Sequence, residues 1–426
     1  MNPLDSKRIL WAWAMYDFAN SAFTTLVVTF IYGTYFTKVI SPNEILGTQY
    51  WSWGISITAV LVSFSSPILG ALADLGGYRK LIMMLSTWLC VLTTALLYFP
   101  QDGQVLAALI LFVIANVCFE FGTVFCNAYL PEIASKERIG SSSGFAWGLG
   151  YVGGLLALVL ALVFLVQPEV PVFSFNTENG ANIRATNLLV SLWFFLFSIP
   201  TFIWVKDRKL QKSNLRKSVK TAFQRLYQTF QALKSYQKIA KFLLARLVYN
   251  DALITIFAFG GIYAAGEIGF SFEEIMILGI VLNVTAGIGA FLMGYLDDRK
   301  GSQRIVQWSI LFLIVACLLA IVAPLLPLWF EDISWFSPKF LFWIAALLIG
   351  FFSGPNQAAS RSLMAHYTPA DKRNEFFGFY AFSGKATSFL GPLLFGWMTT
   401  LFATQQAGIF VVMLMFVTGY FLLKRC

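Results

Sequence analysis

Twelve apolar stretches, each long enough to cross a lipid bilayer, constrain the fold of this chain more than any other feature. A transmembrane helix needs about 20 mainly apolar residues, and structures with unpaired backbone groups are excluded from hydrocarbon. The stretches cover residues 10–37, 50–74, 80–99, 104–129, 142–166, 186–205, 241–266, 274–297, 304–326, 339–360, 375–401 and 405–423. The sequence therefore predicts an all-α membrane protein with twelve transmembrane helices.

The composition favours the same class of protein. Only 12% of the 426 residues are charged and 58% are hydrophobic, whereas a soluble domain carries about 25% charged residues. The first apolar stretch is too long for a signal peptide, and no small-residue cleavage site follows it. We therefore expect a multi-pass membrane protein that keeps its amino-terminal segment.

Lysine and arginine concentrate in alternate connections and at both ends of the chain. These positions are Lys7, Arg8, Arg79, Lys80, Lys136, Arg138, the 206–241 segment, Arg299, Lys300, Arg304, Lys372, Arg373, Lys424 and Arg425. The remaining connections hold only Lys38, Arg184 and Lys339. Because short basic loops stay in the cytoplasm, we expect both termini to be cytoplasmic and the protein to lie in the inner (plasma) membrane. This topology accounts for the net charge of +9, so nucleic acid is not an expected partner.

A basic stretch, residues 206–240, divides the chain into two predicted six-helix bundles, 1–205 and 241–426. Its only acidic residue is Asp207. Its apolar residues recur at helical spacing, at Leu215, Val219, Ala222, Phe223, Leu226, Phe230 and Leu233. Two interpretations remain open: an amphipathic helix that binds membrane lipid at the cytoplasmic surface, or a solvated linker.

The two halves repeat each other. The pairs Gly70/Gly294, Asp74/Asp298, Gly77/Gly301 and Lys80/Arg304 are each 224 positions apart. The stretch from Asp17 to Phe23 matches Asp251 to Phe257 at an offset of 234. Two halves with the same topology indicate parallel repeats, related by an axis along the membrane normal.

The first copy of the loop, Gly70 to Lys80, has the pattern Gly-x-x-x-Asp-x-x-Gly-x-Arg-Lys and resembles the signature loop of the major facilitator superfamily. Its glycines allow close helix approach and a tight turn. Asp74 can cap a neighbouring helix or pair with Arg79, and either contact would form a cytoplasmic gate that must break when that side opens. The predicted gate residues are Gly70, Asp74, Gly77, Arg79, Lys80, Gly294, Asp298, Gly301 and Arg304.

Finer motifs resemble one branch of that superfamily, the vacuole-effluxer-like (autophagy-related amino-acid effluxer) family, in its bacterial form. They are Tyr16-Asp-x-Ala-Asn-Ser-Ala-Phe23, Asn127-Ala-Tyr-Leu-Pro-Glu-Ile-Ala134, Ser143-Gly-x-Ala-Trp-Gly-x-Gly-Tyr-x-Gly-Gly154, Ser360-Arg-Ser362, Glu375-Phe-Phe-Gly-Phe-Tyr380 and Ser383-Gly-Lys385. The resemblance covers essentially the whole chain. It implies a twelve-helix transporter and, from the fungal relatives, amino-acid export.

Polar and charged side chains interrupt those segments that the resemblance places around a central path. The candidate substrate and proton pathway residues are Tyr16, Asp17, Asn20, Glu120, Asn127, Asn250, Asp251, Arg361 and Lys385. A charge inside the bilayer is costly and usually faces the bundle interior or a wet cavity. The alternative is a polar cluster that only packs helices together.

Roles follow from the chemistry of these side chains. Asp17, Glu120 and Asp251 are candidate proton carriers, because a carboxylate away from water takes up a proton more readily and a passing cation favours its release. Arg361 and Lys385 are candidates for pairing with these acids or with a substrate carboxylate. For Arg361, near a cytoplasmic helix end, a gate role or a snorkelling role is an equal alternative.

Glycines and one proline carry the remaining structural expectations. Segments five and eight contain glycines that suit close helix crossing at the interface between the two halves, namely Gly148, Gly150, Gly153, Gly154, Gly287, Gly289 and Gly294. The pair Gly391-Pro392 predicts a kink in segment eleven.

These observations predict a secondary active transporter that moves a small polar, amino-acid-like metabolite by proton-linked alternating access, with export favoured. One alternative is an exporter or importer of a larger amphipathic molecule such as a siderophore or drug, and another is a non-transporting receptor. We expect a monomer without cofactor or metal. An enzyme is not expected, since the chain has one histidine, His366, and five cysteines without ligand spacing.

The sequence makes a direct prediction for Asp17. Replacing it with asparagine removes the ionisable group and should abolish proton-coupled accumulation, whereas Asp74→Asn should slow turnover and leave substrate binding largely intact. Flux in proteoliposomes under an imposed proton gradient measures both effects. Wild-type accumulation by Asp17→Asn would contradict the assignment.

Overall fold

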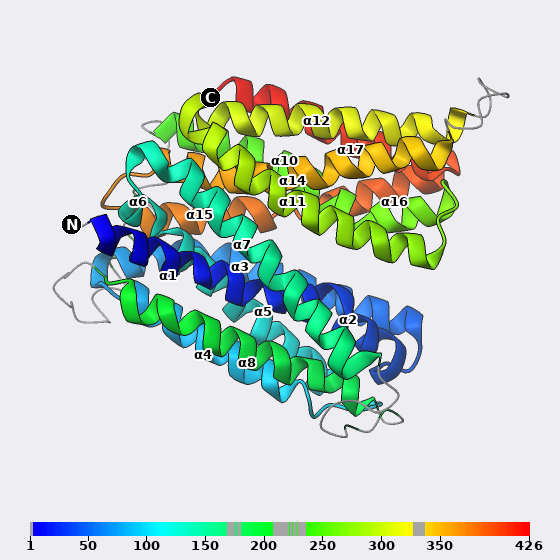
Figure 1. Ribbon diagram of the computed structural model, residues 1–426, viewed down its shortest axis with the longest axis horizontal. Helices are drawn as coiled ribbons and strands as arrows, with labels where there is room; N and C mark the ends of the chain where they lie inside the picture. Colours follow the sequence, from blue (N-terminus) through cyan, green and yellow to red (C-terminus); the bar gives the residue numbers. More distant parts are fainter. Residues whose placement is uncertain are drawn as a thin grey trace. The chain divides into compact units, whose positions relative to one another are not determined.

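The computed structural model describes residues 3–167, 180–207, 236–326 and 337–426, together with the single positions 175, 177, 221, 224 and 228. Within these ranges the regular structure is entirely helical (Figure 1). The seven apolar residues on which the amphipathic helix was predicted, from Leu215 to Leu233, lie outside the described part of the chain.

The amino-terminal half consists of helices joined by short turns. They are α1 (Pro3–Ala22), the π-helix η1 (Phe23–Phe30), α2 (Tyr32–Tyr35), the π-helix η2 (Phe36–Ile40), α3 (Glu44–Gly76), α4 (Arg79–Leu96), α5 (Val105–Asn127), α6 (Leu130–Ile133), the 3-10 helix η3 (Lys136–Arg138), α7 (Ile139–Ala161), the π-helix η4 (Leu162–Val166) and α8 (Ala181–Trp204).

The carboxy-terminal half follows the same plan. Its elements are α10 (Gln237–Gly266), α11 (Phe272–Lys300), α12 (Ser302–Val322), the 3-10 helix η7 (Ala323–Leu325), α14 (Pro338–Tyr367), α15 (Arg373–Lys385), α16 (Leu390–Phe402) and α17 (Gln405–Lys424).

Eleven helical stretches within the described ranges are long and apolar enough to cross a membrane. They correspond to eleven of the twelve predicted segments. The remaining segment, predicted over residues 375–401, is divided into α15 and α16 by a turn at residues 386–389. The predicted kink at Gly391-Pro392 is therefore a complete break, and it lies just before that pair. Proline, which has no backbone N–H, is accommodated in the first turn of α16, where that group needs no partner within the helix.

The chain forms two compact units. The first contains Met1–Ala134, Leu149–Gln228 and Pro369–Phe382, and the second contains Ser135–Gly148, Thr229–Thr368 and Ser383–Cys426. The division falls inside α7 and inside α15. It thus differs from the sequence repeat, and the predicted bundles, 1–205 and 241–426, stay a prediction.

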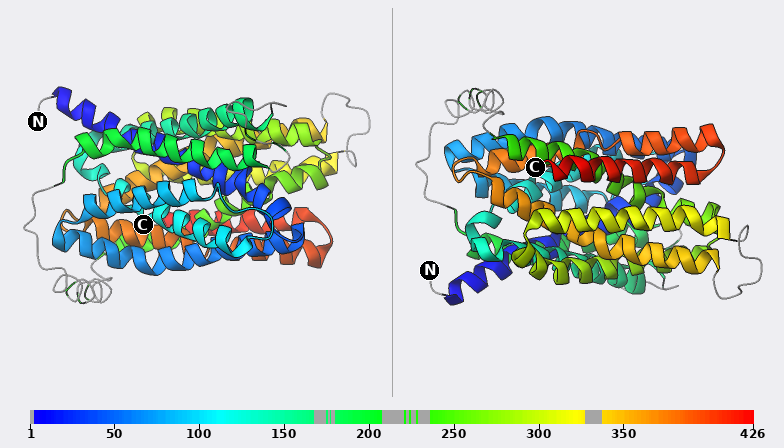
Figure 2. Two further views of the ribbon diagram at one scale, coloured as in Figure 1. Left: turned by 90° about the horizontal axis from the view of Figure 1, so that it is seen from below. Right: turned by 90° about the horizontal axis from the view of Figure 1, so that it is seen from above.

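Each unit has its own set of packed helices (Figures 1 and 2). In the first, α1 packs on α8, α4 packs on α5 and α8, and α3 packs on α5. In the second, α14 packs on α11 and α12, while α17 packs on α10, α12 and α16. Large side chains such as Trp13, Tyr16 and Phe23 are fully buried in the first unit.

Glycines allow α11 and α14 to approach closely. A Cβ atom at Gly289 would collide with the carbonyl oxygen of Phe351, and one at Gly354 would collide with the carbonyl oxygen of Ala286. Small residues at helix interfaces are the usual means by which membrane helices reach such short separations. Both contacts join helices of the carboxy-terminal half, so the crossing between the two halves that the glycines of segments five and eight suggest stays a prediction.

This packing predicts the effect of one methyl group. Gly289→Ala should lower the thermal midpoint of the purified protein, because overpacking a tight interface costs about 1–3 kcal/mol. Gly396→Ala is the matched control, since a Cβ at that helical position meets nothing within 4 Å. Differential scanning fluorimetry in detergent measures both variants. Equal midpoints would contradict the proposed close packing.

Candidate functional site

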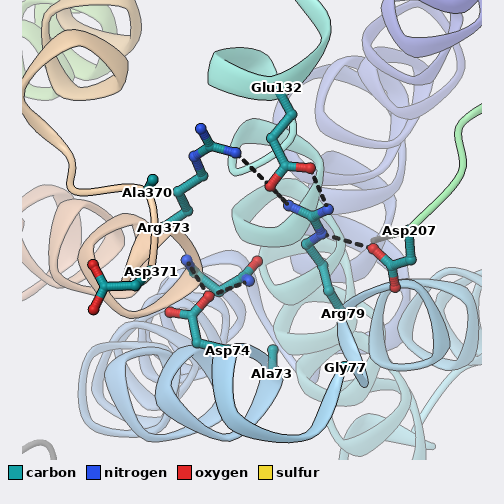
Figure 3. A pocket seen from close by; sticks show the side chains of 10 residues that line it. Ala73, Asp74, Gly77, Arg79, Glu132, Asp207, Ala370, Asp371 and Arg373 are labelled. Carbon is teal, nitrogen blue, oxygen red and sulfur yellow. Dashed lines mark hydrogen bonds and ion pairs between the residues drawn. The ribbon is translucent and has the colours of Figure 1, made fainter. Parts of the chain in front are cut away.

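The loop between α3 and α4 buries an arginine in a network of acids (Figure 3). Arg79 is 4% exposed. Its Nη1 and Nη2 atoms donate to Oε1 and Oε2 of Glu132 at 3.0 and 2.9 Å, and its Nε donates to Oδ1 of Asp207 at 3.0 Å. The guanidinium carbon also lies 3.7 Å from the ring centroid of Tyr129. Paired charge-assisted bonds of this kind are both strong and specific in geometry.

The local sequence explains why Arg79 reaches this position. Gly77 ends α3 with a φ of 65°, a left-handed conformation that glycine adopts without strain. The chain then turns directly into α4. Asp207 accepts from the backbone N–H of Lys80 at 2.9 Å and from the Tyr129 hydroxyl at 2.8 Å. The same carboxylate therefore caps α4 and holds Arg79.

Glu132 is shared between two arginines. Its Oε1 atom lies 2.7 Å from Nη1 of Arg373, at the start of α15. The side chains of Arg79, Glu132 and Arg373 are all largely buried. They line one pocket of about 360 Å³ together with Ala73, Asp74, Gly77, Asp207, Ala370, Asp371 and Asn374 (Figure 3). Removing one of these three charged side chains would leave a buried charge on another without compensation.

Asp74 caps the first turn of α15. Its Oδ1 accepts from the backbone N–H of Asn374 at 3.2 Å and from Nδ2 of the same residue at 2.6 Å, and its Oδ2 accepts from the N–H of Glu375 at 2.9 Å. A Cβ at Gly70 would collide with the carbonyl oxygen of Asn374, which explains the glycine one turn earlier. Of the two roles predicted for Asp74, the structure shows helix capping. Within the described part of the chain, Arg79 binds Glu132 and Asp207 instead.

The second copy of the loop repeats the cap but not the arginine network. Oδ1 of Asp298 accepts from the backbone N–H of Ser141 at 3.1 Å, in the first turn of α7. A Cβ at Gly294 would lie 3.1 Å from the Gly140 carbonyl oxygen, and Gly301 ends α11 with a φ of 89°. Arg304 is exposed and does not copy the buried position of Arg79.

Arg361 also binds the first turns of α7. This fully buried side chain, 2% exposed, donates from Nε to Oγ of Ser143 at 2.9 Å and from Nη2 to the Ser143 carbonyl at 2.8 Å. Its guanidinium lies 5.6 Å from the Trp147 ring. These contacts join α14 to α7, and the roles predicted for Arg361 stay predictions.

Tyr16, Asp17 and Asn20 are all buried on α1. The Tyr16 hydroxyl shares a 2.8 Å hydrogen bond with Thr87 on α4. A Cβ at Gly150 would lie 3.3 Å from the Asp17 carbonyl oxygen, so α1 and α7 pack closely there. On α5, Glu120 is partly buried, and Asn127 is buried at the carboxyl end of the helix.

Asn250 and Asp251 lie at the break in segment eleven. Hydrogen bonds join α10 to both sides of that break. On the α15 side, Arg246 Nη1 donates to Ser383 Oγ (2.9 Å) and Asn250 Nδ2 donates to the Gly384 carbonyl (3.1 Å). In the turn and at the start of α16, Thr387 Oγ1 donates to the Leu247 carbonyl (3.5 Å) and the Gly391 N–H donates to Asp251 Oδ2 (3.2 Å). Lys385 ends α15 at the break. The structure therefore brings three of the predicted pathway residues to one place.

Sequence reasoning did not identify Glu132, Asp207 or Arg373 as partners of one network. Each has a simple local explanation, as part of a loop motif or of a basic connection. The one available signal was Asp207, the single acid in a basic stretch. Among the described residues no cluster of His, Cys, Asp and Glu suits a metal ion. The charges of this site instead hold helix ends, in contacts that a conformational change can make or break.

Comparison with known proteins gives a consistent result. The sequence matches the family described as vacuole effluxer Atg22 like over residues 40–142 and 138–426. It is 28% identical over 418 residues to the uncharacterized MFS-type transporter YxiO of Bacillus subtilis, covering 97% of this chain and 93% of YxiO. It is 22% identical over 378 residues to autophagy-related protein 22 of Saccharomyces cerevisiae, covering 80% of this chain and 70% of that protein.

Solved structures share the fold. The human organic anion transporter MFSD10 has a TM-score of 0.74 at 15% identity, covering 99% of this chain and 100% of that chain. The major facilitator superfamily transporter FucP in its outward conformation has a TM-score of 0.72 at 14% identity, covering 99% and 98%. The predicted all-α fold of this superfamily is confirmed.

The shared carboxylate of Glu132 gives a testable prediction for the network. Glu132→Gln should loosen the contacts of Arg79 and Arg373 and expose Ala73, which is 1% exposed and lines the same pocket. In an Ala73→Cys, Cys426→Ser background, the rate of labelling by a membrane-impermeant maleimide should rise severalfold. The four remaining cysteines are buried.

Glu137→Gln is the matched control for this experiment, because Glu137 is an exposed glutamate close by in sequence. It should leave the labelling rate unchanged. An unchanged rate in Glu132→Gln would show that the network does not keep this pocket closed.

Proposed function

Because the chain belongs to the vacuole effluxer Atg22-like family, we propose that this multi-pass membrane transporter exports a small polar, amino-acid-like metabolite by proton-linked alternating access. A transporter of this kind needs contacts that hold one side closed and that separate once in each cycle. The observation that carries the proposal is the network in which Glu132 binds both Arg79 and Arg373.

The network suits a gate because its free energy depends on several partners at once. Removing any one of them leaves a buried charge without compensation. The contacts are therefore expected to form together and to break together. The Asp74 cap on α15 and the Asp298 cap on α7 add two further contacts to helix starts. In the expected orientation, with both termini in the cytoplasm of the cell, these contacts close the cytoplasmic side.

The charges within the apolar segments support an amino-acid-like cargo. A zwitterion presents one carboxylate and one ammonium group, and it is recognised by side chains of both signs. Lys385 and Arg246 supply positive charge near the break in segment eleven, while Asp17 and Glu120 supply carboxylates in segments one and four. We assign the proton link to the three acids Asp17, Glu120 and Asp251.

We also propose that the protein lies in the inner (plasma) membrane as a monomer that needs no cofactor. The basic stretch 206–240 is proposed to contact membrane lipid through its lysine and arginine side chains. Only its first two residues and a few single positions are among the described ones.

Flux across a metabolite panel tests this function. Purified protein in proteoliposomes should move at least one amino acid or related zwitterion, and an imposed pH gradient should drive its accumulation. The panel includes bulky amphipathic compounds, so that the alternative cargo class is tested in the same assay. Mass spectrometry of the vesicle contents gives the readout.

Arg79→Ala proteoliposomes provide the control, since loss of the gate network should reduce flux while the protein still inserts. Movement of only the bulky compounds would contradict the amino-acid-like cargo. Zwitterion flux that is the same with and without the pH gradient would contradict the proton link.

A further inference from the structure

The break in segment eleven separates two short helices that are held by different acids. Asp74 caps α15 at its amino end. Asp251 accepts the backbone N–H of Gly391, in the first turn of α16. A Cβ at Gly391 would collide with Oγ1 of Thr255, so only glycine lets α16 approach α10 this closely. The start of α16 therefore depends on Asp251.

The two oxygens of Asp251 lie in opposite environments. Oδ2 binds a helix amino terminus, where the N–H group and the helix dipole favour a negative charge. Oδ1 is buried and has no hydrogen-bond partner among the described residues. The side chain is 2% exposed. A buried oxygen without a partner is unfavourable when it carries charge, and a proton on that oxygen removes the cost.

A cavity adjoins this carboxylate. Its volume is about 370 Å³, and its wall includes Leu247, Leu390, Leu394, Leu414, Met415 and Thr418 beside Asp251. The wall is largely apolar and supplies no charge of opposite sign. Because this cavity borders the carboxylate, protonation of Asp251 requires no other side chain to move.

We infer that Asp251 is the proton-binding site that controls the break in segment eleven: its ionised form holds the amino end of α16, and its protonated form releases it. A neutral acceptor makes a weaker hydrogen bond than a carboxylate, so protonation loosens the contact with Gly391. This inference rests on the proposed function, because it gives one of the three acids of that proton link, Asp251, a specific role in the transport cycle.

The repeat explains why this role belongs to Asp251 rather than to Asp17. In the amino-terminal half, α7 corresponds to segment eleven and runs unbroken from Ile139 to Ala161. The first turn of α7 is capped by Asp298. The segment beside Asp17 therefore offers no helix amino terminus at its middle for a carboxylate to bind. The segment beside Asp251 offers one, at the start of α16.

The surroundings of Asp251 contain few other titratable groups. On α10 these are Arg246, which binds Ser383, and Tyr249, whose hydroxyl shares a 2.8 Å bond with Ser360 on α14. α15 contributes Lys385 at its carboxyl end, α16 has no charged residue, and α17 has Tyr420 and its terminal Lys424. The cavity itself is lined by no titratable side chain other than Asp251 among the described residues. A pH response of the break is therefore assigned to this carboxylate.

Hydrogen–deuterium exchange of the full-length protein in lipid nanodiscs tests the inference with the proton as the ligand. After correction for the intrinsic pH dependence, exchange of the amides at 386–391 should rise about tenfold on acidification, the factor that corresponds to one lost charge-assisted hydrogen bond. Asp251→Asn should show the fast rate at every pH. An unchanged pH dependence in Asp251→Asn, or no pH dependence in the wild type, would overturn the inference.

Two control variants separate this effect from general loosening. Asn250→Ala removes the bond to the Gly384 carbonyl and should raise the rate while keeping its pH dependence. Asp17→Asn should leave both unchanged. Size-exclusion profiles establish that each variant is folded. If no metabolite of the panel moves, the proposed function fails, yet the exchange measurement still decides whether Asp251 binds the proton that controls the break.

Discussion

Carboxylates from elsewhere in the fold cap the amino ends of several helices, and the functional features of this structure depend on that interaction. The first N–H groups of a helix have no partner within it, and they attract negative charge. Asp207 caps α4, Asp74 caps α15, Asp298 caps α7, Asp251 caps α16 and Glu267 caps α17. Each cap fixes where a helix begins, and each is a contact that a helix movement can undo.

The caps are contacts of the kind that alternating access requires. A transporter needs discrete contacts that are formed in one state and absent in another. At the start of α15, the Asp74 cap is accompanied by the ion pair between Arg373 and Glu132. At the other end of α15, the break is held by α10. Hydrogen bonds from other helices therefore hold both ends of α15.

Local patterns in the sequence predicted the helices, the family and a helix cap at Asp74, because apolar length and loop spacing are local properties. They did not predict the partners of Arg79, since Glu132 and Asp207 lie 53 and 128 residues away along the chain. Pro392 signalled a disturbance in segment eleven. The full break between α15 and α16 also depends on side chains of α10, and no local pattern in segment eleven reveals that contribution.

The central claim is that the Arg79–Glu132–Arg373 network holds one of two states. Pulsed electron paramagnetic resonance between spin labels on Lys206 and Ala370 tests it most directly, because both positions are exposed and belong to the same compact unit as the network. In nanodiscs we expect two distance populations, with Glu132→Gln shifting weight to the longer one. A single population that Glu132→Gln leaves unchanged would contradict it.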